Sequence, residues 1–112
     1  MTFTEVIKKN LTNYVNFNGR ANREEFWMFY VFALLAPSIL GFVWSWLSSI
    51  AGLLLFIPTA GVTVRRLHDI NKSGWLALLF LIPVVNIILL IVWMAMQDSD
   101  AGANQYGEVP AK

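Results

Sequence analysis

Two long stretches of this sequence, residues 26–64 and residues 75–97, contain no Asp, Glu, Lys, Arg or His. As a single helix the first stretch would be about 58 Å long, whereas the hydrocarbon core of a bilayer is about 30 Å thick. One crossing is therefore too few for it. The sequence instead predicts two helices joined by a tight turn near Ser48-Ser49, where small polar residues interrupt the apolar run.

The composition indicates a membrane protein and excludes several other classes. Hydrophobic residues make up 57% of the chain and charged residues only 13%, whereas a soluble domain carries about 25% charged residues. A chain of 112 residues has too little interior to hide so much apolar surface from water. The lack of cysteine excludes a disulfide scaffold, and a formal net charge of +1 gives no basic surface for a nucleic acid.

We therefore predict an all-α membrane protein with an N-terminal amphipathic interfacial helix and three transmembrane helices. The single membrane domain, residues 1–112, is divided into an amphipathic helix at 1–17, transmembrane helices at 26–47, 50–67 and 75–96, and a polar tail at 97–112. The middle transmembrane helix is the shortest, because its strictly apolar part covers only residues 50–64. To be accommodated, this helix must include the residues up to 67, thin the bilayer locally, or form a re-entrant segment that does not cross.

The N-terminal segment has apolar residues at helical spacing, and Thr2 with Glu5 forms a capping-box pattern that would begin a helix. Such a helix can lie in the bilayer surface, with its apolar face among the acyl chains and its lysines near anionic headgroups. Alternatively, the same face packs on the transmembrane helices. Asn22 with Glu25 forms a second capping-box pattern at the start of the first transmembrane helix.

The positive charges predict an orientation. Four Lys and Arg residues precede the first transmembrane helix, and three more, Arg65, Arg66 and Lys72, precede the third. Because Lys and Arg near helix ends remain on the cytoplasmic side, the N-terminus and the 65–74 loop should be cytoplasmic. Three crossings then place the acidic tail on the outer side. The expected location is the bacterial inner (plasma) membrane, as a multi-pass protein.

The densest group of polar side chains lies in residues 65–75, where Arg65 and Asp69 are four apart and can pair on one helix face. His68, beside them, is the only histidine in the chain. One histidine and one aspartate do not make a metal site, and without cysteine there is no thiolate ligand or nucleophile. We accordingly expect no metal, no cofactor and no catalytic residue.

Cations of the N-terminal segment should face those of the 65–75 segment at the same membrane surface, with acidic side chains between them. The local excess of positive charge can hold an anionic phospholipid headgroup. In the alternative interpretation, these residues set the topology and form ion pairs that tie the cytoplasmic helix ends together. The candidate headgroup or ion-pair residues are Arg20, Arg23, Glu25, Arg65, Arg66, His68, Asp69 and Lys72.

Four stretches, in this order along the chain, resemble a known family. They are residues 17–27 (FNGRANREEFW), 65–69 (RRLHD), 72–75 (KSGW) and 102–107 (GANQYG). Together they resemble DUF805, a bacterial domain-of-unknown-function family, over nearly the whole chain. Phe26 departs from the family pattern, which often has Tyr at that place. The resemblance implies a small bacterial inner-membrane protein and brings no established activity.

Three functions remain open at this point. The leading one is a non-enzymatic membrane module that assembles with itself or with another membrane protein and whose basic cytoplasmic face contacts anionic lipid. A proline in each predicted transmembrane helix, at Pro37, Pro58 and Pro83, leaves open a small transport-related subunit. His68 and Asp69 leave open an enzyme that acts on a lipid headgroup.

Overall fold

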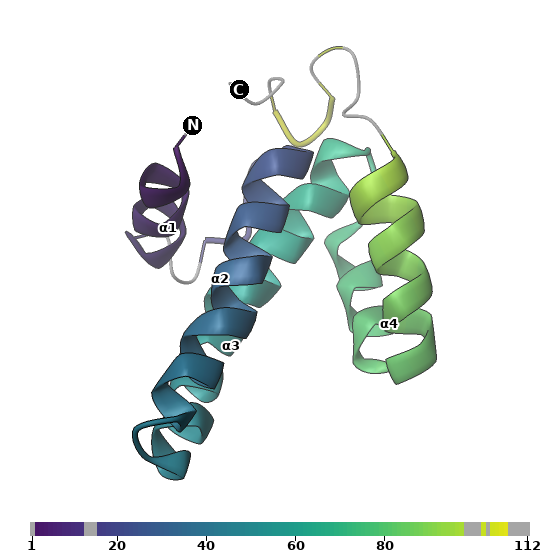
Figure 1. The fold of residues 1–112 in the computed structure, drawn as a ribbon. Helices are drawn as coiled ribbons and strands as arrows, with labels where there is room; N and C mark the ends of the chain where they lie inside the picture. Colours follow the sequence, from purple (N-terminus) through teal and green to yellow (C-terminus); the bar gives the residue numbers. More distant parts are fainter. Residues whose placement is uncertain (1, 13–15, 98–101, 103, 108–112) are drawn as a thin grey trace.

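In the computed structural model of the chain, placement is described for residues 2–12, 16–97, 102 and 104–107 (Figure 1). Within these ranges the regular secondary structure is helical and no strand is present, which confirms the all-α fold class. The elements are α1 (Phe3–Thr12), α2 (Arg23–Gly41), α3 (Ser45–Asp69), the 3₁₀ helix η1 (Gly74–Leu81), α4 (Pro83–Leu89) and the π-helix η2 (Leu90–Met96).

Helices α2 and α3 form a long antiparallel hairpin that extends away from the other elements (Figure 1). Both are long and apolar enough to cross a membrane. The predicted turn near Ser48-Ser49 is wrong, because both serines lie within α3 and the chain turns at residues 42–44. Gly41 allows the close turn, since a Cβ atom on it would lie 3.2 Å from the Cβ of Ser48.

The third predicted transmembrane helix, residues 75–96, is not one continuous helix. A residue that precedes proline is disfavoured in the α conformation, and Ile82 has the extended angles φ −91° and ψ 116°. Pro83 then becomes the first residue of α4, where the missing N–H would have had no helical partner. The break divides the segment into η1 and the continuous helix formed by α4 and η2.

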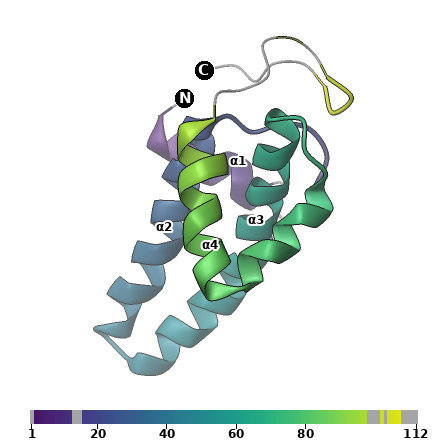
Figure 2. The same ribbon diagram turned by 90° about the vertical axis from the view of Figure 1, so that its right-hand side faces the viewer.

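These two arms form a V-shaped unit, the return hairpin (residues 74–96), which begins and ends at the same end of the molecule (Figure 2). Its beginning lies against α3, where a Cβ on Gly74 would meet Val64 Cγ1 at 2.7 Å. Its end lies against the first turns of α2, because Trp27 Nε1 donates to the carbonyl of Met94 at 2.9 Å. The chain therefore returns by residue 97 to the end of the molecule where α2 begins.

The capping box predicted for the N-terminal helix is present. Glu5 N donates to Thr2 Oγ1 at 3.2 Å, and the Thr2 hydroxyl donates to the Glu5 carboxylate at 3.0 Å, which lowers the pKa of Glu5. The described part of this helix is Phe3–Thr12, and residues 1 and 13–15 of the predicted range 1–17 lie outside the described residues. Its buried residues, Val6 and Asn10, lie on the side that packs on α2 and α3. This contact corresponds to the second interpretation of the N-terminal segment, in which the apolar face of its helix packs on the following helices.

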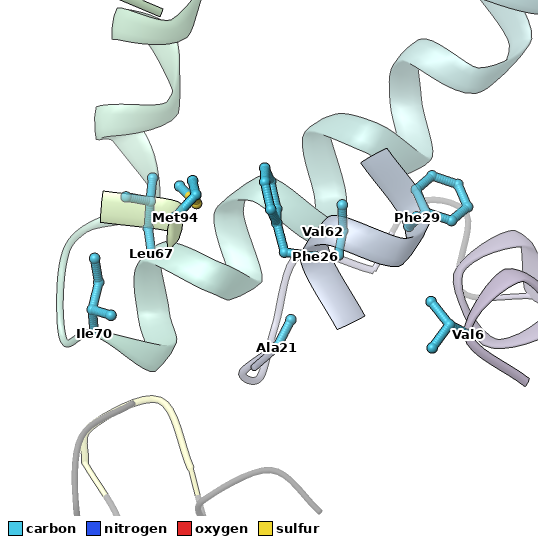
Figure 3. Packing of buried hydrophobic residues seen from close by; sticks show 8 residues of the cluster. All are labelled: Val6, Ala21, Phe26, Phe29, Val62, Leu67, Ile70 and Met94. Carbon is cyan, nitrogen blue, oxygen red and sulfur yellow. The ribbon is translucent and has the colours of Figure 1, made fainter. Parts of the chain in front are cut away.

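The hydrophobic core lies at the end of the molecule where α1, the start of α2, the end of α3 and η2 meet. Figure 3 shows its buried members, Val6, Ala21, Phe26, Phe29, Val62, Leu67, Ile70 and Met94. Away from this end, large apolar side chains are exposed, among them Phe42 at 91% and Leu53 at 75%. Apolar surface of this extent on a helical hairpin indicates contact with lipid.

Candidate functional site

The end of α3 places several side chains of the 65–69 stretch at the core. The helix stops because Asn71 adopts a left-handed conformation with φ 59°, which asparagine tolerates better than most residues. Lys72 N then donates to the carbonyl of Leu67 at 2.8 Å, and Asn71 N donates to that of His68 at 3.0 Å. These two bonds are a Schellman motif, and they fix where the last turn of α3 points its side chains.

Asp69 is fully buried and binds two arginines. Arg20 Nε donates to Oδ1 at 3.0 Å, and Arg66 Nη1 donates to Oδ2 at 2.7 Å. Arg66 is also fully buried, and Arg20 is 6% exposed. Both oxygens of the carboxylate are therefore occupied, by one residue of the α1–α2 linker and one of α3. Such a buried ion pair offsets its desolvation only when its geometry is good and its remaining donors find acceptors.

One Nη group of each of these two arginines binds carbonyls of the C-terminal segment. Arg20 Nη1 donates to the carbonyls of Gly102 at 2.8 Å and Gly107 at 3.2 Å. Arg66 Nη2 donates to the carbonyl of Gln97. The C-terminal segment is thus fastened to the end of α3 by the same arginines that bind Asp69.

A second part of the site joins α1, α2 and α3. The Glu25 carboxylate, 1% exposed, accepts from Lys9 Nζ at 2.8 Å and from Asn10 Nδ2 at 3.3 Å. The other end of the Asn10 amide, Oδ1, accepts from Arg65 Nη2. Arg65 also donates to the carbonyl of Asn16 at 3.3 Å. The Asn10 amide therefore bridges a buried carboxylate and a buried guanidinium by hydrogen bonds.

We call these two parts together the polar network, and the end of the molecule that contains it the network end. Its side chains are Lys9, Asn10, Arg20, Glu25, Arg65, Arg66 and Asp69.

His68 is bound separately from Asp69. Its Nδ1 lies 2.9 Å from the carbonyl of Gly19, and its ring stacks on Tyr106 with centroids 3.8 Å apart. Asn104 Nδ2 donates to the backbone carbonyl of His68 at 3.0 Å. The side chains of His68 and Asp69 therefore bind different partners.

Two of the predicted site residues lie at the margin of the polar network rather than in it. Arg23 is exposed and donates through Nη1 to the carbonyl of Ala95 at 2.9 Å. The Lys72 ammonium lies 5.3 Å from the centre of the Trp93 ring, a cation–π distance. Both residues tie η2 to the network end while remaining partly accessible.

One pairing expected from the sequence is replaced by another. Arg65 and Asp69, four residues apart, do not pair, because Asn10 and the Asn16 carbonyl bind the Arg65 guanidinium. Arg66 instead pairs with Asp69 at a spacing of three. The N-terminal segment and the 65–75 segment do meet as expected, since Arg20 binds Asp69 although they are 49 positions apart in the sequence.

Sequence reasoning missed four residues of the site, Lys9, Asn10, Asn104 and Tyr106. Asn10 had a signal, because it falls three and four residues after Ile7 and Val6 and so lies in the apolar stripe of its helix. A polar side chain at a buried position needs hydrogen-bond partners. Asn104 and Tyr106 had no such signal, because their contacts depend on how the C-terminal segment returns.

The fold and the site define a helical protein with two helices of membrane-crossing length and a buried polar network at one end. The chain belongs to the family described as "Protein of unknown function (DUF805)", whose model matches residues 14–108. It is 40% identical to "Inner membrane protein YhaH" of Escherichia coli (strain K12), covering 91% of this chain and 93% of that relative.

A second relative from Escherichia coli (strain K12), "Inner membrane protein YhaI", is 37% identical over 89% of this chain and 90% of its own length. No solved structure matches the chain. The four stretches that carry the family resemblance come from three separate regions of the sequence, and residues from each of them meet at the network end.

Proposed function

We propose that this chain is a non-enzymatic module of the bacterial inner membrane whose network end faces the cytoplasm. The carrying observation is that the buried charged groups of the family stretches bind other side chains and the backbone. Arg20, Arg66 and Asp69, for example, form one buried cluster with the C-terminal carbonyls. Side chains held in this way stabilise a fold and are not available as an acid, a base or a nucleophile.

The placement in the membrane follows from the fold and the charges. Helices α2 and α3 cross the bilayer, and the return hairpin enters and leaves on the cytoplasmic side. Positive residues gather at the network end, as the positive-inside rule requires of a cytoplasmic surface. The names of the relatives from Escherichia coli support the inner membrane as the location.

The headgroup contact is best assigned to the exposed cations of this face. Arg65 and Arg66 are 3% and 0% exposed, so they cannot reach a headgroup without breaking the polar network. Lys8 and Arg23 are exposed and Lys72 is partly exposed. Each cation near an anionic surface contributes about 1 kcal/mol. We therefore place anionic phospholipid against these three residues.

The test compares phosphatidylglycerol with phosphatidylcholine binding to the purified, delipidated protein by native mass spectrometry. The unsubstituted protein should prefer phosphatidylglycerol, and a variant with Lys8→Gln, Arg23→Gln and Lys72→Gln should lose that preference by about 10-fold or more. Glu24→Gln is the matched control, because it removes an exposed charge of the opposite sign. Equal binding of the two lipids by the unsubstituted protein would contradict the proposal.

A further inference from the structure

A partly open apolar cavity of about 260 Å³ lies between α3 and the return hairpin. Its walls come from four elements and are lined by Tyr30, Phe56, Thr59, Ala60, Thr63, Ala77, Leu78, Phe80, Leu81 and Asn86. This volume exceeds the roughly 150 Å³ apolar cavity that accepts benzene, and it approaches the roughly 300 Å³ lower bound of ligand sites. The cavity is therefore large enough for a chain-like apolar ligand.

The cavity opens toward the surface that faces lipid. Three of its lining residues are more than half exposed, Phe56 at 56%, Leu78 at 58% and Leu81 at 65%. Thr63 and Thr59 lie three and seven residues before Arg66 on α3, and a helix rises about 1.5 Å per residue. The cavity thus begins roughly 5–10 Å from the level of the polar network, at the depth of acyl chains in the nearer leaflet.

Most polar groups of the lining already have backbone partners. The hydroxyls of Thr59 and Thr63 donate to the carbonyls of Leu55 at 2.6 Å and of Thr59 at 2.8 Å. The Asn86 amide donates to the carbonyl of Phe80 at 2.6 Å. By contrast, the Tyr30 hydroxyl has no hydrogen-bond partner among the described residues. An unpaired hydroxyl at this depth is costly, and an acceptor on a ligand would remove that cost.

The Tyr30 side chain is directed toward the network end of α2. Its ring stacks on Phe26, one turn closer to that end, with centroids 5.4 Å apart and planes at 17°. Side chains of α-helices lean toward the N-terminus, so the hydroxyl lies nearer the bilayer surface than the Tyr30 Cα does. The polar groups of a phospholipid nearest to this depth are the ester carbonyls, which accept hydrogen bonds.

We infer that this cavity holds one acyl chain of a phospholipid from the cytoplasmic leaflet, with the Tyr30 hydroxyl donating to its ester carbonyl. The inference rests on the membrane placement proposed above, but it concerns a different site from the exposed cations. The cavity recognises the hydrocarbon chain and the ester, so lipid binding there does not depend on the charge of the headgroup.

The inference is tested by filling the cavity with larger side chains. Ala60→Phe on α3 and Ala77→Phe on η1 each place a ring in the cavity from a different wall. Leu53→Phe is the matched control, since Leu53 is 75% exposed on the same helix as Ala60 and lies outside the lining. Native mass spectrometry of delipidated protein titrated with dioleoyl phosphatidylcholine should show one bound lipid whose dissociation constant rises at least 10-fold in both cavity variants. Leu53→Phe should bind as the unsubstituted protein does.

Tyr30→Phe keeps the ring and removes only the hydroxyl, so it tests the hydrogen bond without changing the packing. It should weaken phosphatidylcholine binding about 2- to 10-fold, the effect of one net hydrogen bond. Unchanged binding in Ala60→Phe and Ala77→Phe would overturn the inference, as would equal losses in Leu53→Phe. The proposed function fails separately, if the unsubstituted protein binds phosphatidylglycerol no better than phosphatidylcholine while its phosphatidylcholine binding is intact.

Discussion

Asp69 connects three segments of the chain: the α1–α2 linker, the end of α3 and, through its two arginines, the C-terminal segment. Its carboxylate binds Arg20 and Arg66, and one Nη group of each arginine donates to carbonyls among Gln97, Gly102 and Gly107. Loss of the Asp69 charge would leave two guanidinium groups buried without a counter-ion. Removing one partner of a buried ion pair is far more costly than replacing the whole pair by apolar groups.

Asp69→Asn therefore tests the cluster with little change of shape. It should lower the free energy of unfolding by roughly 3–5 kcal/mol, because two buried cations lose their shared anion. The measurement is equilibrium unfolding in detergent, followed by circular dichroism. Glu24→Gln, at an exposed position, should change the same quantity by less than about 0.5 kcal/mol. Equal effects of the two substitutions would contradict a structural role for Asp69.

Asn10 gives a second prediction at the scale of one residue. Asn10→Leu keeps a similar volume but leaves Glu25 and Arg65 each without one partner. It should lower the free energy of unfolding by about 1–3 kcal/mol, the cost of buried groups left unpaired. Lys8→Gln, on the exposed side of the same helix, provides the comparison in the same unfolding experiment. If Asn10→Leu left the free energy of unfolding unchanged, the hydrogen bonds of Asn10 would not contribute to stability.

The sequence made most of the candidate site predictable, though not its pairings. Charged residues in a chain this apolar had to gather at a helix end, and Arg20 does meet Asp69 there. Which arginine pairs with Asp69 was not predictable from spacing alone. Positions three and four residues away are nearly equivalent on a helix, and the choice of Arg66 over Arg65 depends on Asn10, which comes from another helix.

At the scale of elements, the break at Ile82 decides the fold. Residues 75–97 have the length and composition of a transmembrane helix, and composition is the same whether such a segment crosses or turns back. The local signal was Pro83, which disfavours a helical residue before it. Pro37 and Pro58 carry the same signal, yet they lie inside the continuous helices α2 and α3. Proline alone therefore did not identify which segment would break.

The end of α3 is a second element whose geometry makes a prediction. Asn71 has φ 59°, a conformation that costs an ordinary residue about 1–2 kcal/mol. Asn71→Val should lower the free energy of unfolding by about that amount, whereas Asn71→Gly should be neutral or stabilising. Equilibrium unfolding of the two variants measures the difference. If valine and glycine behaved alike, the left-handed turn after α3 would not form in solution.

At the scale of the whole molecule, the return hairpin brings the C-terminal segment to the same side as the N-terminal segment. The chain has no cysteine, so single-cysteine variants report accessibility without background. Asn18→Cys and Gln105→Cys should react with a membrane-impermeant maleimide only in inverted membrane vesicles. Val43→Cys, in the turn between α2 and α3, should react in spheroplasts. Labelling of Gln105→Cys in spheroplasts would contradict the return hairpin and favour a third crossing.

The attachment of the C-terminal segment implies an order of events in time. Arg20 and Arg66 precede their carbonyl partners at Gln97, Gly102 and Gly107 by 31 to 87 positions, so they leave the ribosome before those partners do. During synthesis these arginines are still hydrated at the membrane surface, where positive charge keeps a segment on the cytoplasmic side. Only after these partners have also been made can the two arginines bind them and become interior residues. The same guanidinium groups therefore direct insertion first and stabilise the finished protein afterwards.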